Sequence, residues 1–312
     1  MNLVLTAPDL ASHGLRRAYR GRFAPTPSGP LHMGSLLTAL ASYLQARCAG
    51  GSWLLRMDDL DAERSRADHA DTILGQLEAH RLLWDEPVRW QSRHVEQYEQ
   101  AFVQLCRHTT CYRCTCTRAT LAADSRLGID GPVYSGRCRH SCRVDGNGSW
   151  RLAVAPGVLG IEDPWHGTID RCLVDDVGDF VVRRADGLIG YQLACVVDEQ
   201  AQRITEVVRG ADLIGSSIRQ RHLQRLLQLS LPEYRHLPLL LDANGNKLSK
   251  QNHAKPIDNS TAAANLQHCL KLLGQDPPPS LESASAEETI EWAVARWNPQ
   301  RLPREATLAN SN

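Results

Sequence analysis

The stretch PTPSGPLHMGS fills Pro25–Ser35 and combines three prolines, two glycines and one histidine. The short segment Tyr19–Ala24 before it suits a strand, and SWLLRM (Ser52–Met57) after it is a compact apolar strand. Between them, Gly50-Gly51 ends a segment whose apolar residues recur at the i, i+3, i+4, i+7 spacing of a helix, namely Met33, Leu36, Leu37, Leu40 and Leu44. Strand, glycine loop, helix and strand form a βαβ unit, so the sequence predicts an α/β fold with a parallel sheet.

The composition of the 312-residue chain is typical of a globular protein, with 42% hydrophobic and 22% charged residues. Its 35 basic and 35 acidic side chains cancel, so any contact with RNA would have to use a local basic surface. Apolar runs are too short to span a membrane, and the first residues lack the pattern of a secretory signal. We therefore expect a cytoplasmic protein.

Helical periodicity or strand patterns identify further elements along the chain. Asp179–Val197 is predicted to form two strands joined by a tight turn at Asp186-Gly187. GQDPPPS (Gly274–Ser280) is predicted to be a linker between two helices. The predicted helices cover residues 66–82, 94–107, 216–229, 261–273 and 287–297.

The loop at Pro25–Ser35 lies between a strand and a helix, where free backbone N–H groups can bind a phosphate. Gly29 and Gly34 allow close backbone approach, and His32 can donate a hydrogen bond to a phosphoryl oxygen. The alternative is a helix start whose histidine merely packs against its neighbours.

A second stretch, NGNKLSKQNHAKP (Asn244–Pro256), carries Lys247 and Lys250 on a glycine- and asparagine-rich loop. Two such lysines can close over a polyphosphate, although a solvated basic loop has the same composition. The two stretches together favour a nucleotide site that holds His32 and Lys250 on one triphosphate.

At these residues the sequence resembles a known family. HMGS is similar to the HIGH signature and KLSK to the KMSKS signature of class I aminoacyl-tRNA synthetases. GRFAPTPSGPLHMGSL, LLRMDDLD, YQLACVVDE and VVRGADL resemble the glutamyl subgroup, over about Gly21 to Pro256. Only 56 residues follow Pro256, too few for an anticodon-binding domain. The resemblance is therefore closest to the truncated paralogues, the glutamyl-queuosine tRNA(Asp) synthetases.

This resemblance implies a ligase with a Rossmann-like catalytic domain. It would activate L-glutamate with ATP and magnesium, then transfer the glutamyl group to the cyclopentene diol of queuosine at the wobble position of tRNA(Asp). The implied catalytic residues are His32 and Lys250, and the implied ATP-binding residues are His32, Gly34, Ser35, Lys247 and Lys250.

Glutamate needs cations for its two carboxylates and an anion for its ammonium, and the planar fork of arginine suits carboxylates. Arg22, Arg209 and Asp58 lie where predicted strands end. The hydroxyl of Tyr191 can form a hydrogen bond with the ligand. The family pattern extends the implied glutamate-binding set to Arg22, Phe23, Ala24, Pro25, Thr26, Asp58, Tyr191 and Arg209. The family usually has RIED where this chain has RMDD, so Asp58 replaces a glutamate and reaches the ammonium less far. A structural ion pair is the alternative role for each charged residue.

Ten cysteines include a cluster between Cys111 and Cys138, which favours a metal over disulfides. Cys114, Cys116 and Cys138 supply three thiolates for a tetrahedral zinc ion. From spacing alone the fourth ligand stays open among His140, Cys142 and Cys111, and a set of free thiols is the alternative to a metal site. The resemblance, in which C-x-C is followed by Y-x-x-x-C, implies Tyr134 as the fourth ligand of one structural zinc.

Combining these predictions divides the chain into five parts. They are an N-terminal extension (1–17), the first half of the catalytic domain (18–108), a zinc-bearing insertion (109–178), the second half (179–230), and a small, mostly helical C-terminal region with the KLSK loop (231–312). We expect a monomer without an anticodon-binding domain.

One basic segment of the sequence is a candidate for the tRNA contact. The segment SIRQRHLQRLL offers Arg219, Arg221, His222 and Arg225 to phosphates, or is an ordinary amphipathic surface helix. Alternative functions are a shortened glutamyl-tRNA synthetase that charges the 3′ end of tRNA(Glu), a small-molecule nucleotidyltransferase, and a non-catalytic zinc-bearing RNA-binding module.

Overall fold

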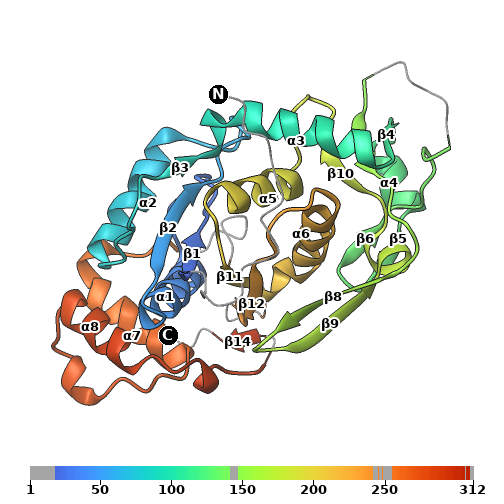
Figure 1. Cartoon of the computed structure of the whole chain (residues 1–312). Helices are drawn as coiled ribbons and strands as arrows, with labels where there is room; N and C mark the ends of the chain where they lie inside the picture. The colour runs from blue at the N-terminus through green and yellow to red at the C-terminus, as the bar shows by residue number, and fades with distance from the viewer. Residues whose placement is uncertain are drawn as a thin grey trace.

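The fold is built on a parallel β-sheet, as the βαβ pattern predicts. The computed structural model describes residues 18–140, 147–241, 245, 248, 255–305 and 307–309. Strand β1 (Arg20–Phe23) pairs in parallel with β2 (Ser52–Met57), and β2 pairs with β3 (Arg89–Trp90). Strand β11 (Glu206–Gly210) pairs in parallel with β12 (Glu233–Leu237). Figure 1 shows β11 beside β1, where the backbone N–H of Thr205 donates to the carbonyl of Arg20 at 2.9 Å.

Both faces of this sheet are buried, because successive strand residues enter two different hydrophobic clusters. Trp53, Leu55 and Met57 of β2 join one cluster, while Leu54 joins the other. This alternation explains why SWLLRM is almost continuously apolar. The first cluster packs under α1 (Met33–Cys48), α2 (Ala67–Ala79), α7 (Ala262–Leu272) and α8 (Ala286–Arg296), and the second under α3 (Val95–His108), α5 (Tyr191–Ala201) and α6 (Ile214–Leu226).

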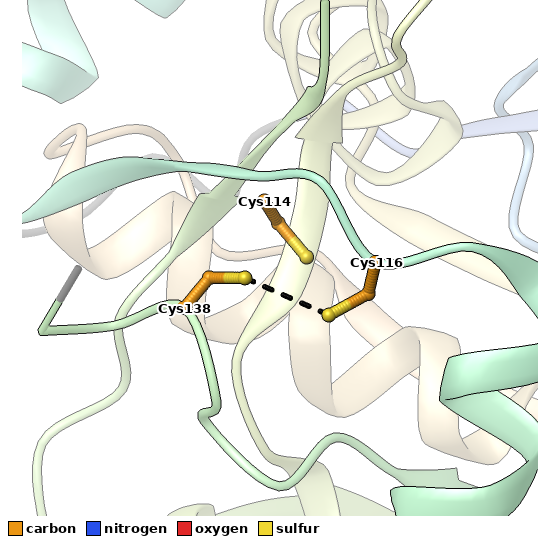
Figure 2. Close-up of side chains that lie close together, drawn as sticks. All are labelled: Cys114, Cys116 and Cys138. Carbon is orange, nitrogen blue, oxygen red and sulfur yellow. Dashed lines mark hydrogen bonds between the residues drawn. The ribbon is translucent and has the colours of Figure 1, made fainter. Parts of the chain in front are cut away.

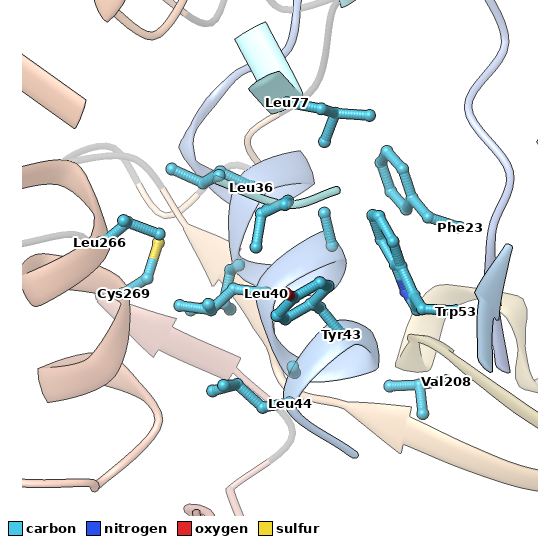
Figure 3. Close-up of a cluster of buried hydrophobic side chains, with 14 of the residues drawn as sticks. Phe23, Leu36, Leu40, Tyr43, Leu44, Trp53, Leu77, Val208, Leu266 and Cys269 are labelled. Carbon is cyan, nitrogen blue, oxygen red and sulfur yellow. The ribbon is translucent and has the colours of Figure 1, made fainter. Parts of the chain in front are cut away.

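Helix α1 lies at the centre of the first cluster. Figure 3 shows Leu36, Leu40 and Leu44 along one helix, with Trp53 on one side and Leu266 on the other. The C-terminal helices α7 and α8 therefore complete the core of the sheet domain. None of the described helices combines the length and apolarity needed to cross a bilayer.

The segment between α3 and β10 (Phe180–Arg183) folds as small antiparallel sheets beside the main sheet (Figure 1). Strand β7 (Ser149–Leu152) pairs with both β4 (Cys111–Cys114) and β10. Two hairpins and two helical segments complete it: β5 (Arg126–Gly128) with β6 (Gly131–Val133), β8 (Val158–Asp163) with β9 (Gly167–Cys172), α4 (Arg118–Asp124) and η2 (Leu173–Val177).

The remaining elements are short. Strand β13 (Leu239–Leu241) pairs in parallel with β14 (Thr307–Ala309). Single 3-10 turns occur at η1 (Gln91–Arg93), η3 (Ala211–Leu213), η5 (Asn259–Thr261), η6 (Pro279–Leu281) and η7 (Pro299–Arg301). The predicted helices are confirmed, with ends that differ by one to three residues.

One predicted element is wrong. The hairpin predicted over Asp179–Val197 contains its first strand, β10, and its turn, but the second strand is replaced by helix α5. The returning chain forms only the bridge from Ile189 to Arg183 before Gly190 caps the helix. Residues Leu193–Glu199 of α5 are all buried. A helix enclosed on all sides has no polar face, so its apolar run is indistinguishable from a buried strand.

Gly51 illustrates how tightly the turn after α1 meets β1. A Cβ atom on Gly51 would lie 2.3 Å from the backbone oxygen of Tyr19, whereas a Cβ on Gly75 in α2 would meet nothing within 4 Å. We expect Gly51→Ala to destabilise the fold by at least about 1–3 kcal/mol, because the backbone of Tyr19, directly before β1, cannot yield. Gly75→Ala should stabilise it by about 0.5–1 kcal/mol. Urea unfolding of both variants measures this, and an unchanged midpoint for Gly51→Ala would contradict the contact.

Candidate active site

One cleft of about 370 Å³ opens at the carboxyl ends of β1 and β11. Parallel sheets bind ligands at this edge. The structure brings ten of the predicted site residues into its lining: Arg22, Phe23, Ala24, Pro25, Thr26, His32, Gly34, Ser35, Tyr191 and Arg209. Arg64 and Asp212 also line it, and no spacing pattern in the sequence singles them out. Asp58 is absent from the lining, and Lys247 and Lys250 lie outside the described residues.

His32 sits at the N-terminus of α1 as its capping residue. Its backbone is extended (φ −111°, ψ 172°), and its Nδ1 accepts a hydrogen bond from the backbone N–H of Ser35 at 3.3 Å. A neutral imidazole that accepts at Nδ1 carries its proton on Nε2, so Nε2 is a donor. A Cβ atom on Gly34 would lie 3.3 Å from the ring of His32. Because Gly34 has no side chain, the imidazole of His32 can pack directly against the first turn of α1.

The KLSK stretch reaches the same cleft. The backbone N–H of Leu248 donates to the carbonyl of Leu240 at 2.8 Å, and both leucines line the cleft. Farther along, Pro256 forms a bridge with His32, and the N–H of Ile257 donates to the carbonyl of Leu31 at 2.9 Å. The loop thus leaves from and returns to the immediate surroundings of His32. The convergence of His32 and Lys250 stays a prediction.

Arg22 and Arg209 are buried at the inner end of the cleft. Arg22 donates to the carbonyl of Val208 at 3.2 Å and pairs with Glu199 at 3.3 Å. Burial lowers the pKa of Arg22, and Glu199 opposes this shift. Arg209 donates from Nε and Nη2 to the Oγ of Ser217, at 3.2 and 2.6 Å.

Each of these two guanidiniums keeps one buried N–H group without a hydrogen-bond partner in the described part of the chain, Nε of Arg22 and Nη1 of Arg209. A buried unsatisfied donor costs about 1–3 kcal/mol, and more when it is charged. Two such donors in one cleft are suited to an anionic ligand.

Asp58, the predicted ammonium ligand, is already engaged. Its two oxygens accept from Nε and Nη2 of Arg56 at 2.6 and 3.3 Å. Burial raises the pKa of Asp58, and the charge of Arg56 counteracts this. Asp198 extends the network, because it accepts from Arg89 at 2.6 Å and from the hydroxyl of Tyr98 at 2.7 Å. The side chain of Asp58 therefore forms a structural ion pair with Arg56, which was the alternative to a role in ligand binding. Its contact with a ligand ammonium stays a prediction.

The predicted zinc ligands meet beside β4. Figure 2 shows the side chains of Cys114, Cys116 and Cys138 pointing toward one another, and their sulfurs all lie within 4.8 Å. The sulfurs of Cys116 and Cys138 are 3.6 Å apart, and the Oη of Tyr134 lies 3.4 Å from Cys114 and 3.6 Å from Cys116. Although burial opposes it, hydrogen bonding with the Tyr134 hydroxyl helps to lower the pKa of Cys138 to about 7.

Of the other candidates for the fourth zinc ligand, Cys111 and His140 lie outside the cysteine cluster. Cys111 interacts with Cys106 instead of joining the cluster, and His140 is exposed. Cys142 lies outside the described residues.

Helix α6 turns most of its predicted RNA-binding side chains inward. Arg219 and His222 are half-buried, and Arg221 lies over the ring of Tyr234 and donates to the carbonyl of Pro232 at 2.6 Å. Arg225 is exposed. Three of the four residues are therefore part of the packing of α6.

Comparison with known proteins identifies the family. Residues 18–270 match the family model of class I tRNA synthetases (E and Q), catalytic domain. The glutamyl-Q tRNA(Asp) synthetase of Methylococcus capsulatus is 48% identical over 91% of this chain and 93% of its own length. The chain belongs to the glutamyl-Q tRNA(Asp) synthetase family. The glutamyl-Q tRNA(Asp) synthetase of Chromobacterium violaceum is 47% identical to this chain, over 91% of this chain and 95% of its own length. That of Pseudomonas aeruginosa is 45% identical, over 93% of this chain and 97% of its own length.

Among solved structures, the glutamate-tRNA synthetase of Elizabethkingia anophelis superimposes with a TM-score of 0.73 at 22% identity. The match covers 95% of this chain and 68% of that one. At this identity the likeness establishes the fold, the class I catalytic fold with a parallel sheet.

Proposed function

We propose that this protein activates L-glutamate with ATP and transfers the glutamyl group to queuosine at the wobble position of tRNA(Asp). The observation that carries the proposal is the pair of buried arginines, Arg22 and Arg209, which face the same cleft as His32 and the start of α1. Substrate identity follows the relatives, which are named for this activity and match nearly the whole chain.

The charge balance of the amino-acid end suits glutamate. Arg22 pairs with Glu199, whereas Arg209 forms no ion pair among the described residues. One buried guanidinium of the cleft therefore has no carboxylate in direct contact. Glutamate at neutral pH carries two carboxylates and one ammonium, hence one net negative charge. A carboxylate of bound glutamate would give Arg209 the negative partner that it lacks.

The nucleotide end would hold ATP through the N-terminus of α1. In this proposal the phosphates lie at Gly34 and Ser35 and accept the Nε2–H of His32, and Lys247 and Lys250 close over them. Magnesium, bound with ATP, would supply charge neutralisation on the phosphates. A carboxylate oxygen of glutamate attacks the α-phosphorus, and pyrophosphate leaves. The chain positions the reactants and stabilises charge without transferring a proton.

In the second step a hydroxyl of queuosine attacks the carbonyl carbon of the mixed anhydride. The bond to the phosphate oxygen breaks, AMP leaves, and the proton of the attacking hydroxyl is released to the solvent. Incubating the protein with labelled glutamate, ATP and tRNA(Asp) tests the whole proposal, with tRNA(Asp) lacking queuosine as the matched control. Label should appear in the anticodon fragment and depend on queuosine. Label at the 3′ end of tRNA(Glu) would favour a shortened glutamyl-tRNA synthetase instead.

We further infer that Cys114, Cys116, Cys138 and Tyr134 hold one structural zinc ion in the insertion 109–178. Zinc–sulfur bonds of about 2.3 Å in a tetrahedron place the sulfurs roughly 3.8 Å apart, and an oxygen ligand sits slightly closer. The separations of 3.4 to 3.6 Å among Cys114, Cys116, Cys138 and the Tyr134 hydroxyl fit this arrangement. Such an ion would fasten β4 to the chain that follows β6.

His32→Asn tests the nucleotide end. Asparagine is a good N-cap, so the start of α1 is kept while the donor at the Nε2 position is lost. We expect kcat for glutamate-dependent pyrophosphate exchange to fall about 10²-fold, because one donor to developing charge contributes about 3 kcal/mol. His108→Asn, at an exposed position on α3, is the control. Equal rates for the two variants would remove His32 from the mechanism.

A further inference from the structure

A continuous chain of hydrogen bonds leads from the cleft to the β8–β9 hairpin. It begins at Arg209, whose Nε and Nη2 donate to the Oγ of Ser217. The same Oγ lies 2.6 Å from Nε2 of His236. Nδ1 of His236 lies 2.7 Å from Oδ2 of Asp163, which also accepts the backbone N–H of His236 at 2.9 Å. The side chains of His236 and Asp163 are fully buried.

The valences of these atoms fix the direction of every hydrogen bond. Guanidinium groups only donate. The Oγ of Ser217 therefore accepts with both of its lone pairs, one from Nε and one from Nη2 of Arg209. Its single proton must then go to Nε2 of His236 or to the carbonyl of Leu213, 3.1 Å away. Because the carboxylate of Asp163 can only accept, it takes the proton on Nδ1, and this leaves Nε2 as the acceptor of the Ser217 hydroxyl.

A protonated imidazole would break this pattern. An Nε2–H group would need a third lone pair on Ser217, and a second cation would face Arg209. Burial and the charge of Arg209 both lower the pKa of His236, against the opposing effect of Asp163. The other groups around the ring are Tyr234, stacked at 6.3 Å, and His166, whose ring is 6.5 Å away. Neither supplies a negative charge.

We propose that Ser217, His236 and Asp163 form a positioning relay that orients Arg209 for the carboxylate of its substrate. The relay occupies Nε and Nη2 of Arg209. We assign to the ligand the remaining nitrogen, Nη1, which is buried and has no hydrogen-bond partner in the described part of the chain. This inference rests on the proposed function of Arg209 in glutamate binding.

The relay also connects two parts of the fold. Arg209 lies on β11, Ser217 on α6 and His236 on β12, all in the sheet domain. Asp163 ends β8 in the insertion, where its Oδ1 accepts the N–H of Trp165 at 2.7 Å. The hairpin of the insertion is thereby tied to the geometry of the amino-acid site.

Ser217→Ala is the direct test, in pyrophosphate exchange by the full-length protein. We expect the KM for glutamate to rise about tenfold, since a hydrogen bond to a charged group is lost. The kcat and the KM for ATP should stay within about twofold. Thr289→Ala, which removes a buried hydroxyl from α8, is the matched control and should leave all three constants unchanged. Asp163→Asn should raise the KM for glutamate severalfold, because an amide no longer fixes the tautomer of His236.

Nitrogen-15 NMR of histidine-labelled protein provides a readout that does not depend on activity. His236 should be neutral with its proton on Nδ1, its signal being assigned by its loss in His236→Gln. A proton on Nε2 would overturn the relay, as would an unchanged KM for glutamate or an equal rise in both KM values in Ser217→Ala. If the wild type shows no glutamate-dependent exchange, the proposed function fails, and the Nδ1–H tautomer of His236 would still support the relay.

Discussion

Replacing Arg209 by methionine is expected to lower kcat/KM for glutamate in pyrophosphate exchange by about 10²- to 10³-fold. The guanidinium is buried, forms no ion pair among the described residues, and keeps Nη1 without a partner. Removing one partner of a buried charge pair costs about 2–5 kcal/mol, most of it from the carboxylate left without its cation. The effect should fall on glutamate, with the KM for ATP nearly constant.

Arg221 provides a matched control for this experiment. Both guanidiniums stack on the ring of Tyr234, Arg209 at 4.9 Å and Arg221 at 5.2 Å from its centre. Arg221 lies outside the cleft lining and donates instead to the carbonyl of Pro232. Arg221→Met should therefore leave exchange within a few-fold of the wild type. If both variants lose activity equally, Arg209 acts through the packing of Tyr234 and not through the ligand.

Much of the candidate site could be predicted because its residues follow local patterns. The glycine loop and the helix start depend on neighbouring residues, so sequence spacing alone places His32 at the N-terminus of α1. Strand endings likewise place Arg22 and Arg209 at one edge of the sheet. These features require only short-range rules.

The partners of these residues could not be predicted in the same way. Glu199 and Ser217 reach the arginines from α5 and α6, and α5 itself was predicted to be a strand. Asp58, directly after β2, was expected to face a ligand, but Arg56, two residues earlier, donates to both its oxygens. The partners of Arg22 and Arg209 depend on which side chains of α5 and α6 share a buried layer with them, and spacing within one segment does not encode that.

Motifs that are far apart in the sequence lie side by side in the structure. The GRFAPTPSGPLHMGSL and VVRGADL stretches supply adjacent parallel strands, β1 and β11, although more than 180 positions separate Arg22 and Arg209. The helices α1, α2, α3 and α5 and the insertion all lie in the interval between them. A long sequence separation is therefore compatible with a single cleft.

Replacing Cys138 by serine is expected to remove the bound zinc and to lower glutamyl transfer to tRNA at least tenfold, with pyrophosphate exchange kept within about threefold. The proposed ligands lie outside the cleft lining, so glutamate and ATP do not contact them. A structural zinc site contributes folding energy directly, and its loss should loosen β4 and the segment after β6, where we expect the tRNA to dock. Metal analysis of the purified variant and the two assays measure these effects.

Two further substitutions make the zinc prediction specific. Cys172→Ser, in the same insertion but outside the cluster, should keep one zinc per chain and both activities. Tyr134→Phe retains the ring that packs 3.9 Å from the guanidinium of Arg151 but loses the Oη, so zinc should be held more weakly. If Tyr134→Phe keeps full zinc occupancy, Tyr134 is not the fourth zinc ligand and Cys142 becomes the candidate. Cys142→Ser would then test that residue. Equal loss of exchange and transfer in Cys138→Ser would contradict a role confined to the RNA-docking insertion.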